Sequence, residues 1–254
     1  MGGAVHTFRQ TWRPFGCPLI FLDDSTKRLQ IFQDFAKNHP LGGYVLHSLS
    51  AKFHQVEDIL HERGIDICHE TVRFWVNWFG TKFAKEIRKK RLGRHSNWRW
   101  HLDEVFVKIN SERFYLWRAV NHEGEVLECF VTKRHNKAAA KKFLIKILRK
   151  HGSPKIITTD ELPSYRAAFR EIGIADKKLC CGRSNNRCEN SHLPFRRRER
   201  AMQRFKTVAA LQKFVSYHSQ IYNHFNQQRH LESRQSFKQK RTTALTEWFN
   251  FCAA

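Results

Sequence analysis

The sequence predicts an α/β protein in which a mixed β-sheet is flanked by helices and preceded by a small all-α domain. Three observations support this prediction. Two amphipathic helical stretches lie between residues 50 and 80, and the apolar pattern changes to a strand-like one near Trp100. Three consecutive strand-like stretches then precede a helix, a strand and a second helix. Because the helical and strand-like patterns occupy separate parts of the chain, we expect two structural units.

The composition is that of a folded and strongly basic protein. The chain has 254 residues, of which 41% are hydrophobic and 13% aromatic, enough to bury a core. Its 46 Lys and Arg against 23 Asp and Glu give a formal net charge of +23, which favours a polyanionic partner such as nucleic acid. A membrane surface is the rival partner, but no stretch approaches the roughly 20 apolar residues of a spanning helix. We therefore expect a cytoplasmic nucleic-acid-binding protein with no membrane association.

The seven cysteines do not suggest a metal site. Four are scattered and Cys180, Cys181 and Cys188 lie near one another, but no C-x2-C pair occurs. A structural zinc site is therefore not expected. Reduced thiols in a cytoplasmic protein are the preferred interpretation.

Residues 1–45 are the least interpretable part of the chain. Leu29, Phe32 and Phe35 have helical spacing between Ser25 and Ala36, and a stretch containing Asn, Pro and Gly follows. We assign no function to residues 1–45.

Residues 46–92 are expected to form a helix-turn-helix domain followed by a basic linker. Val56, Ile59 and Leu60 share one helical face before Gly64, and HETVRFWVNWFG at residues 69–80 resumes the same spacing. Two such helices around a tight link are typical of a helix-turn-helix, although an ordinary helical hairpin is an equally good interpretation. In the first interpretation, the second helix presents these side chains to a DNA groove: His69, Glu70, Arg73 and Asn77.

The stretch after this helix is dense in basic residues. Arg88, Lys89 and Lys90 belong to KEIRKKRLGRH, which is either a linker along the DNA backbone or a solvated face. Both interpretations stay open from the sequence.

The second unit is expected at residues 95–225. The stretches 100–109, 113–120 and 125–134 are rich in β-branched and aromatic residues and predict a three-stranded meander, with Asn110 and Ser111 in its first turn. Helical spacing follows at 137–152.

The next stretches complete this unit. PKIITTD at 154–160 is a buried type of strand, LPSYRAAFREIG at 162–173 reads as a helix, and residues 207–225 form a closing core helix. The order β-β-β-α-β-α is that of a ribonuclease-H-like layer, and residues 226–254 are left as a C-terminal tail.

Two acidic residues lie where a sheet usually carries its site. Asp103 lies inside the first strand, where Asp is locally unfavourable, and Asp160 ends the fourth. If these strands are neighbours, the two carboxylates converge and repel unless a cation such as Mg²⁺ lies between them. The alternative is that both are ordinary solvated acids, like the nearby Glu104 and Glu161.

A third acid precedes a basic helix. Asn185 and Asn186 can cap a helix that has Glu189 in its first turn, and Pro194 should bend it. The basic face beyond Glu189 would hold the DNA backbone against the metal site, and it includes Arg196, Arg197, Arg200 and Arg204.

The motifs HLDEVFVKI, YLWRAV, ITTDELPSY and NNRCENSHLPFRRRERAMQRF occur in this order from His101 onward. Together they closely resemble bacterial insertion-sequence transposases of the DDE type, in particular the replicative, cointegrate-forming group. The resemblance covers the chain from about residue 50. It implies a mixed five-stranded ribonuclease-H-like sheet of the integrase type, with the three catalytic, metal-binding acids at Asp103, Asp160 and Glu189.

The same resemblance implies the activity. Such a protein is a polynucleotidyl transferase that binds element ends, nicks DNA with water and joins the freed 3′-hydroxyl to target DNA. It would use Mg²⁺, with Mn²⁺ as a substitute, and act as a homo-oligomer on double-stranded DNA in the bacterial nucleoid. The alternatives are a transposase-derived DNA-binding protein that no longer cuts, or a nucleic-acid packaging protein.

Two further residues are given packing or surface roles. His192 is expected on the helix surface, although it can also assist at the metal site. Tyr165 can contact a phosphate near Asp160, but packing explains it equally well.

Overall fold

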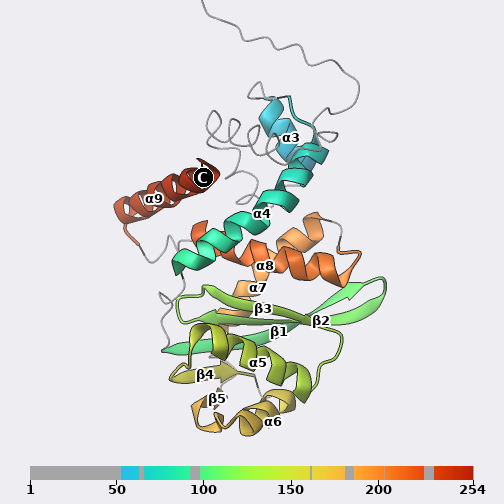
Figure 1. Ribbon diagram of the computed structural model, residues 1–254, viewed down its shortest axis with the longest axis vertical. Coiled ribbons are helices and arrows are strands. Elements are labelled where there is room, and N and C mark those ends of the chain that lie inside the picture. The colour runs from blue at the N-terminus through green and yellow to red at the C-terminus, as the bar shows by residue number, and fades with distance from the viewer. Residues whose placement is uncertain are drawn as a thin grey trace, which may run out of the picture.

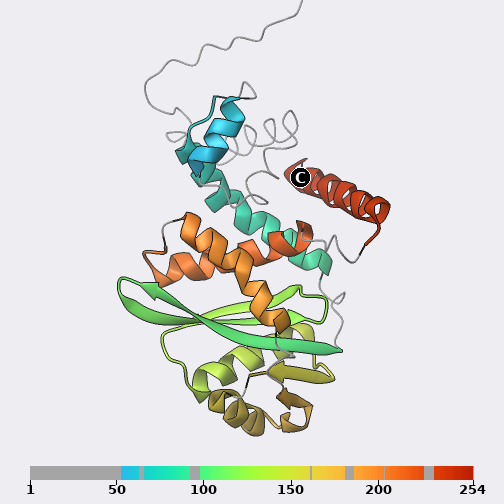
Figure 2. The ribbon, with the colours of Figure 1, turned by 180° about the vertical axis from the view of Figure 1, so that it is seen from behind.

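The computed structural model describes residues 53–62, 66–91, 98–160, 162–180, 186–202, 204–225 and 232–253. Within these ranges it has helices, a short 3-10 helix η1 (Ala175–Lys177) and one five-stranded sheet (Figures 1 and 2). The helix expected between Ser25 and Ala36 lies outside them.

The sheet has the predicted ribonuclease-H-like arrangement. Its strands are β1 (Arg99–Ile109), β2 (Glu112–Asn121), β3 (Val126–Thr132), β4 (Ile156–Thr159) and β5 (Lys178–Cys180), in the order β3-β2-β1-β4-β5. The first three form an antiparallel meander, while β4 and β5 join in parallel next to β1. This order places β1 in the middle of the sheet.

The first hairpin follows from its two turn residues. Ile109 pairs with Glu112, so Asn110 and Ser111 alone make the turn, and their φ angles are 50° and 66°. A two-residue turn with both φ angles positive matches the twist of the strands, and Asn tolerates that conformation well. The predicted turn is confirmed.

Two helices cover one face of the sheet. They are α5 (Lys137–His151) and α6 (Pro163–Ile172), which pack against each other below the sheet in Figure 1. Asn136 caps α5 by accepting a hydrogen bond from the amide of Ala139. The core on this face includes Trp117 and Phe143, both fully buried.

The other face carries α7 (Asn186–Ala201) and α8 (Val208–Phe225), with α7 against β1 and β2 and α8 against β3. The second core continues from this face into the N-terminal helices α3 (Phe53–His61) and α4 (His69–Arg91). The helix α7 continues through Pro194, so this proline does not end the helix.

The helix α4 is a single element of 23 residues that reaches the α/β unit. The basic stretch expected as a linker or solvated face is helical as far as Arg91, and Ile87 within it is buried, as is Phe83 just before it. A Cβ atom added at Gly80 would lie 3.3 Å from the ring of Tyr217, so this glycine permits the close approach of α4 to α8. Residues 92–97 lie outside the described ranges.

The C-terminal segment differs from the expected tail. Arg234–Ala253 form the helix α9, which runs beside the N-terminal helices in Figures 1 and 2. Trp248 of α9 is 1% exposed and contacts the ring of Phe83, with ring centroids 4.8 Å apart. The helix is therefore packed against α4. Within the part of the chain described, no helix combines the length and the apolar character needed to cross a bilayer.

Candidate active site

Asp103 and Asp160 come together because β1 and β4 are adjacent. The two strands pair in parallel with His101 opposite Thr158, and the same register two residues further on brings residue 103 beside residue 160. Carboxylate oxygens of Asp103, Glu104 and Asp160 all lie within 4.8 Å of one another. The convergence expected for the two aspartates is therefore present, with Glu104 as a third member.

Glu104 reaches this group from the opposite face of β1 to Asp103. Its side chain is 10% exposed, and its Oε1 lies 2.9 Å from Nε2 of His135. Burial, followed by the charges of Asp160 and Asp103, raises the pKa of Glu104 to about 8. Burial also lowers the pKa of His135, against the raising effect of Asp160. Both shifts favour the neutral forms of the Glu104 carboxyl and the His135 imidazole, and two neutral groups can share the hydrogen bond between them.

Asp103 is held on both of its oxygens. Its Oδ1 accepts a hydrogen bond of 2.9 Å from the backbone amide of Glu104, and its Oδ2 lies 3.1 Å from Nε2 of His192 on α7. His192 is 7% exposed, so the expectation of a helix-surface histidine is wrong. A buried histidine that touches a carboxylate fixes the orientation of that carboxylate.

Asp160 has a raised pKa. Burial is the main cause, and the charge of Asp103 adds to it, while a hydrogen bond from the amide of Leu162 opposes both. Burial and the nearby negative charge thus disfavour ionisation of Glu104 and Asp160 until positive charge is supplied.

The group fits a hard divalent cation. Mg²⁺ takes oxygen ligands at 2.0–2.1 Å, so opposite ligands of one ion lie about 4 Å apart, which is compatible with carboxylate oxygens that all lie within 4.8 Å of one another. The Glu104 carboxyl is held by His135 and by a side-chain hydrogen bond with Tyr165. A cation at this group would add positive charge beside carboxyl groups that protein contacts already orient.

Glu189 lies in the first turn of α7, as expected, but is exposed and outside the group of converging carboxylates. It precedes His192 by three residues, so both lie on one side of the helix, about one turn apart. The contact between His192 and Asp103 therefore brings this side of α7 to the site. The segment 181–185 before α7 lies outside the described residues.

Tyr165 is part of the hydrophobic core. It is fully buried, and its ring meets Trp117 edge to face, with centroids 5.4 Å apart. Of the two interpretations of Tyr165, packing is the one that this burial supports.

The arginines expected to hold DNA fall into two groups on α7 and beyond. Arg196, Arg200 and Arg204 line a hollow of about 610 Å³ together with Phe106, Lys108 and Glu199. Arg197 is exposed and does not line it. Phe106 is three residues from Asp103, about 10 Å along the strand, so the basic hollow begins close to the acidic group.

Arg196 differs from the other arginines of this hollow. Its guanidinium donates to the carbonyl of Phe106 at 2.7 Å and to Glu199 at 2.6 Å. Arg200 and Arg204 are exposed. Arg196 thus ties α7 to the edge of β1, and the other two are better placed to meet a ligand.

The basic residues of α4 have different surroundings. Arg73 and Asn77 are exposed, and Arg73 pairs with Glu70 at 2.8 Å. Arg88 lies against the carbonyl of Ser216 in α8. The other two have partners within α4 and in α9: Lys89 pairs with Glu86 and Lys90 lies over the ring of Phe251.

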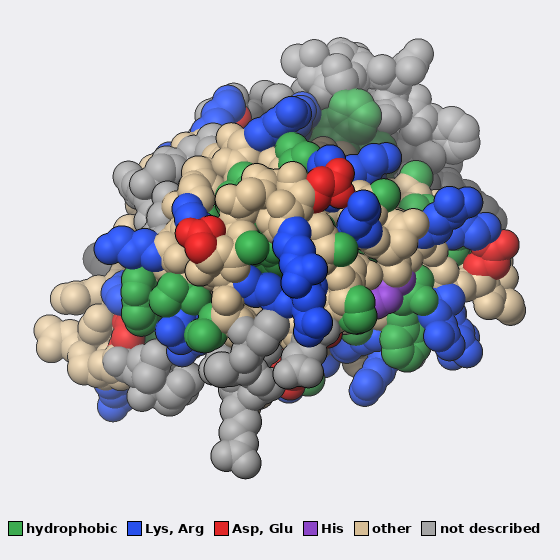
Figure 3. Space-filling view, turned by 90° about the horizontal axis from the view of Figure 1, so that it is seen from below, with side chains coloured by type: hydrophobic (Ala, Val, Ile, Leu, Met, Phe, Trp, Pro, Cys, Tyr) green, Lys and Arg blue, Asp and Glu red, His purple; other side chains and the backbone are tan. Residues whose placement is uncertain are grey.

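Basic side chains are also numerous on the surface away from α4 and α7. On the lower end of the molecule, where α6 and β5 lie, Lys and Arg gather and acidic side chains are sparse (Figure 3). The charge surplus is therefore spread over the surface and is not confined to α7.

A family model described as a DDE domain, of the IS240 transposase type, matches residues 97–228. This span contains all three acids predicted from the sequence. The chain belongs to the DDE transposase family. Matched residues cover the whole sheet and both layers of helices.

Curated relatives of this DDE transposase family member agree with the assignment. The transposase for insertion sequence-like element IS431mec of Staphylococcus aureus is 29% identical over 132 residues, 52% of this chain and 57% of the relative. The transposase for insertion sequence element IS257 in transposon Tn4003, from the same species, is 28% identical over the same shares. The chain thus spans a little over half the length of these relatives.

Solved structures give weaker likenesses to this family member. The catalytic domain of Mos1 mariner transposase has a TM-score of 0.39 and 15% identity, over 67% of this chain and 90% of that one. A simian T-cell lymphotropic virus intasome in complex with a PP2A regulatory subunit has a TM-score of 0.43 and 19% identity, over 56% of this chain and 54% of that one. The family assignment rests on the sequence match.

Proposed function

We propose that this protein is an active transposase, a polynucleotidyl transferase that binds the ends of an insertion sequence, nicks DNA and joins the freed 3′-hydroxyl to target DNA. The observation that carries the proposal is the convergence of Asp103 and Asp160 from adjacent strands of a DDE domain. Family membership supports the reaction class, and the acidic group supports the position of the chemistry.

The proposed metal ligands are Asp103, Asp160 and Glu189, with Mg²⁺ as the ion and Mn²⁺ as a substitute. When bound, the ion supplies positive charge that favours ionisation of the attacking hydroxyl or water and offsets charge on the leaving oxygen. Asp103 is oriented for this role by His192. Glu189 lies one turn before His192 on α7, and the contact of His192 with Asp103 supports treating Glu189 as the third ligand.

The chain's own residues position the substrate. Arg200 and Arg204 would bind phosphates of the DNA backbone beside the acids, and Arg197 would extend this contact along α7. Arg196 shapes the hollow through its bonds to Phe106 and Glu199. His135 and Glu104 form a neutral pair at one side of the site, so they add little charge repulsion toward phosphate.

End recognition is assigned to the N-terminal helices. We propose that α3 and the first half of α4 form a helix-turn-helix in which Arg73 and Asn77 face a DNA groove. Their exposure supports this role. Arg88, Lys89 and Lys90 would be nearer the α/β unit, with at most a backbone contact. Self-association on paired element ends is part of the same proposal.

A strand-transfer assay with labelled element ends tests the chemistry. With Mg²⁺ the unmodified protein should nick and join DNA, and Asp103→Asn, Asp160→Asn and Glu189→Gln should each abolish both steps. The matched control is Asp176→Asn, an exposed carboxylate of η1 outside the acidic group, which should remain active.

The Glu104→Gln variant tests whether Glu104 or Glu189 is the third metal ligand. If Glu104→Gln is inactive while Glu189→Gln still cuts, the third ligand is Glu104. Retained joining by Asp103→Asn would overturn the metal-site assignment. Binding of ends without nicking under either Mg²⁺ or Mn²⁺ would favour the DNA-binding protein that no longer cuts.

A further inference from the structure

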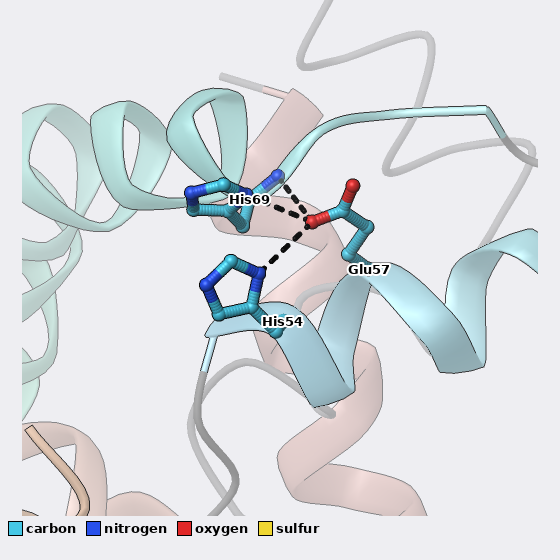
Figure 4. A group of neighbouring side chains, drawn as sticks. All are labelled: His54, Glu57 and His69. Carbon is cyan, nitrogen blue, oxygen red and sulfur yellow. Dashed lines mark hydrogen bonds and ion pairs between the residues drawn. The ribbon is translucent and has the colours of Figure 1, made fainter.

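A second group of metal-ligating side chains lies at the junction of α3 and α4, far along the chain from the acidic site. His54 and Glu57 are one turn apart on α3, and His69 is the first residue of α4. Figure 4 shows both imidazole rings facing one oxygen of the Glu57 carboxylate. One ligand atom from each of the three lies within 4.8 Å of the other two.

The spacing of the donors matches a tetrahedral ion. Nδ1 of His69 lies 2.9 Å from Oε2 of Glu57, and Nδ1 of His54 lies 3.6 Å from the same oxygen. Ligands at 2.0–2.2 Å from a tetrahedral zinc ion are about 3.3 Å apart, which falls between these two distances. The ring centroids of the two histidines are only 3.8 Å apart. Two imidazoles this close can both reach a single ion.

The remaining nitrogen of His69 has the partner that a metal-bound histidine usually has. Nε2 lies 3.4 Å from Oε1 of Glu70, which is itself paired with Arg73 at 2.8 Å. A carboxylate on the far side of a ligating imidazole fixes its ring and raises its basicity. Glu70 is therefore positioned as a support for the ligand, outside the ligand group.

We propose that His54, Glu57 and His69 form a binding site for a divalent transition-metal ion such as Zn²⁺, with water completing the coordination. The site joins two helices, so the bound ion has a structural role and stabilises the α3–α4 junction. The cysteine spacing does not predict this site, because its donors are imidazoles and a carboxylate. The inference does not depend on the proposed transposase activity.

The same atoms also allow a metal-free explanation. The backbone amide of His69 donates to Oε2 of Glu57 at 3.0 Å, so Glu57 caps the start of α4. In that case Nδ1–H of His69 completes the cap, and His54 is a neighbour with a largely exposed side chain, 68% accessible. Zinc binding distinguishes the two explanations, since a cap alone needs no ion.

The test uses the full chain carrying Asp103→Asn and Asp160→Asn, so that the acidic site does not take up the ion. Zn²⁺ titration calorimetry in reducing buffer should give one stoichiometric site, and Zn²⁺ should raise the melting temperature. Co²⁺ should give the visible absorption of a tetrahedral site. His54→Ala should remove all three signals, because His54 is exposed and its loss spares the fold.

His61→Ala is the matched control, because His61 is an exposed histidine on the same helix outside the group. It should bind like the parent. Glu70→Gln should weaken binding by about 10-fold or more without abolishing it. The proposal is overturned if the parent shows no stoichiometric site, or if His54→Ala binds as tightly as His61→Ala.

Discussion

His192 Nε2 lies 3.1 Å from Asp103 Oδ2, which joins α7 to the central strand β1 at the acidic site. The contact is buried, since His192 is 7% exposed. It couples the position of the helix that carries Glu189 to the orientation of Asp103.

Removing this contact should weaken catalysis more than folding. His192→Ala is expected to lower the nicking rate by about 10- to 100-fold and to raise the Mg²⁺ concentration needed for half-maximal rate, because Asp103 loses its orienting partner. The rate should be measured over a range of Mg²⁺ concentrations. Leu193→Ala, at the neighbouring exposed position, is the control. A normal Mg²⁺ requirement in His192→Ala would show that the contact does not orient Asp103.

Glu104 should make stability fall as the pH rises. Its pKa is raised from 4.5 to about 8, chiefly by burial, so the folded state keeps a proton that the unfolded state loses between these values. In that window one such group lowers the free energy of unfolding by up to about 1.4 kcal/mol per pH unit.

Urea unfolding without metal, at pH values from about 5 to 8, measures this effect. Glu104→Gln should flatten the slope relative to the unmodified protein, and Asp176→Asn should leave it unchanged. Equal slopes for Glu104→Gln and the unmodified protein would show that Glu104 ionises normally.

Glu128 should have the opposite effect to Glu104 and make the free energy of unfolding fall as the pH is lowered. Burial would raise its pKa, but the hydrogen bond from Lys150 and the charges of Lys150 and Lys146 outweigh burial and lower it. The stability from this group is therefore present above the unfolded pKa and is lost as the pH falls through the lower, folded pKa.

Lys150→Ala should destabilise the fold at pH 7 by about 1–3 kcal/mol, because it removes the hydrogen bond to a carboxylate that is 5% exposed and leaves Lys146 as its remaining ion-pair partner, with a further charge contribution from Arg88. Lys142→Ala, at an exposed position of α5, is the matched control. Urea unfolding of both variants measures the difference, and equal stabilities would contradict the importance of the Glu128 ion pairs.

Two arginines of α7 should differ in whether their removal affects DNA binding alone or also the stability of the fold. Arg200→Ala is expected to weaken DNA binding and to reduce the salt slope of log K by about 0.9, the loss of one phosphate contact, without changing stability. Arg196→Ala should also lower stability, because it removes the bonds to Phe106 and Glu199. Binding measured at several salt concentrations, with thermal melts, distinguishes them. An unchanged salt slope in Arg200→Ala would exclude a phosphate contact there.

The sheet and its helices were predictable because their signals are local. Asn110 and Ser111 mark a tight turn, and the apolar spacing of α5 and α8 is strong. β5 has three residues and too short a pattern to recognise. Residues 83–91 were harder to interpret, because lysines and arginines surround the buried residues Phe83, Ala84 and Ile87. The high charge made this part of α4 look solvated, although one side of it is buried.

The acidic site was only partly predictable. The positions of Asp103 and Asp160 on their strands predict that these two residues belong to the site. Glu104 could not be predicted in the same way, because adjacent residues of a strand point to opposite faces and Glu104 follows Asp103 directly. The sequence does not reveal that β4 stops at Thr159, which lets Asp160 approach carboxylates from both faces. For His192 the sequence left a role at the metal site open but favoured the helix surface, because its burial depends on where α7 packs.

The continuity of α4 has a mechanical consequence. At 1.5 Å per residue its 23 residues span about 34 Å, roughly one turn of B-form DNA. If α3 holds a DNA segment as proposed, the helix α4, which packs on α8, would set the distance between that segment and the bond to be cut. Lengthening α4 by one helical turn should then shift the cleavage position along the duplex, whereas a flexible connection would leave it unchanged.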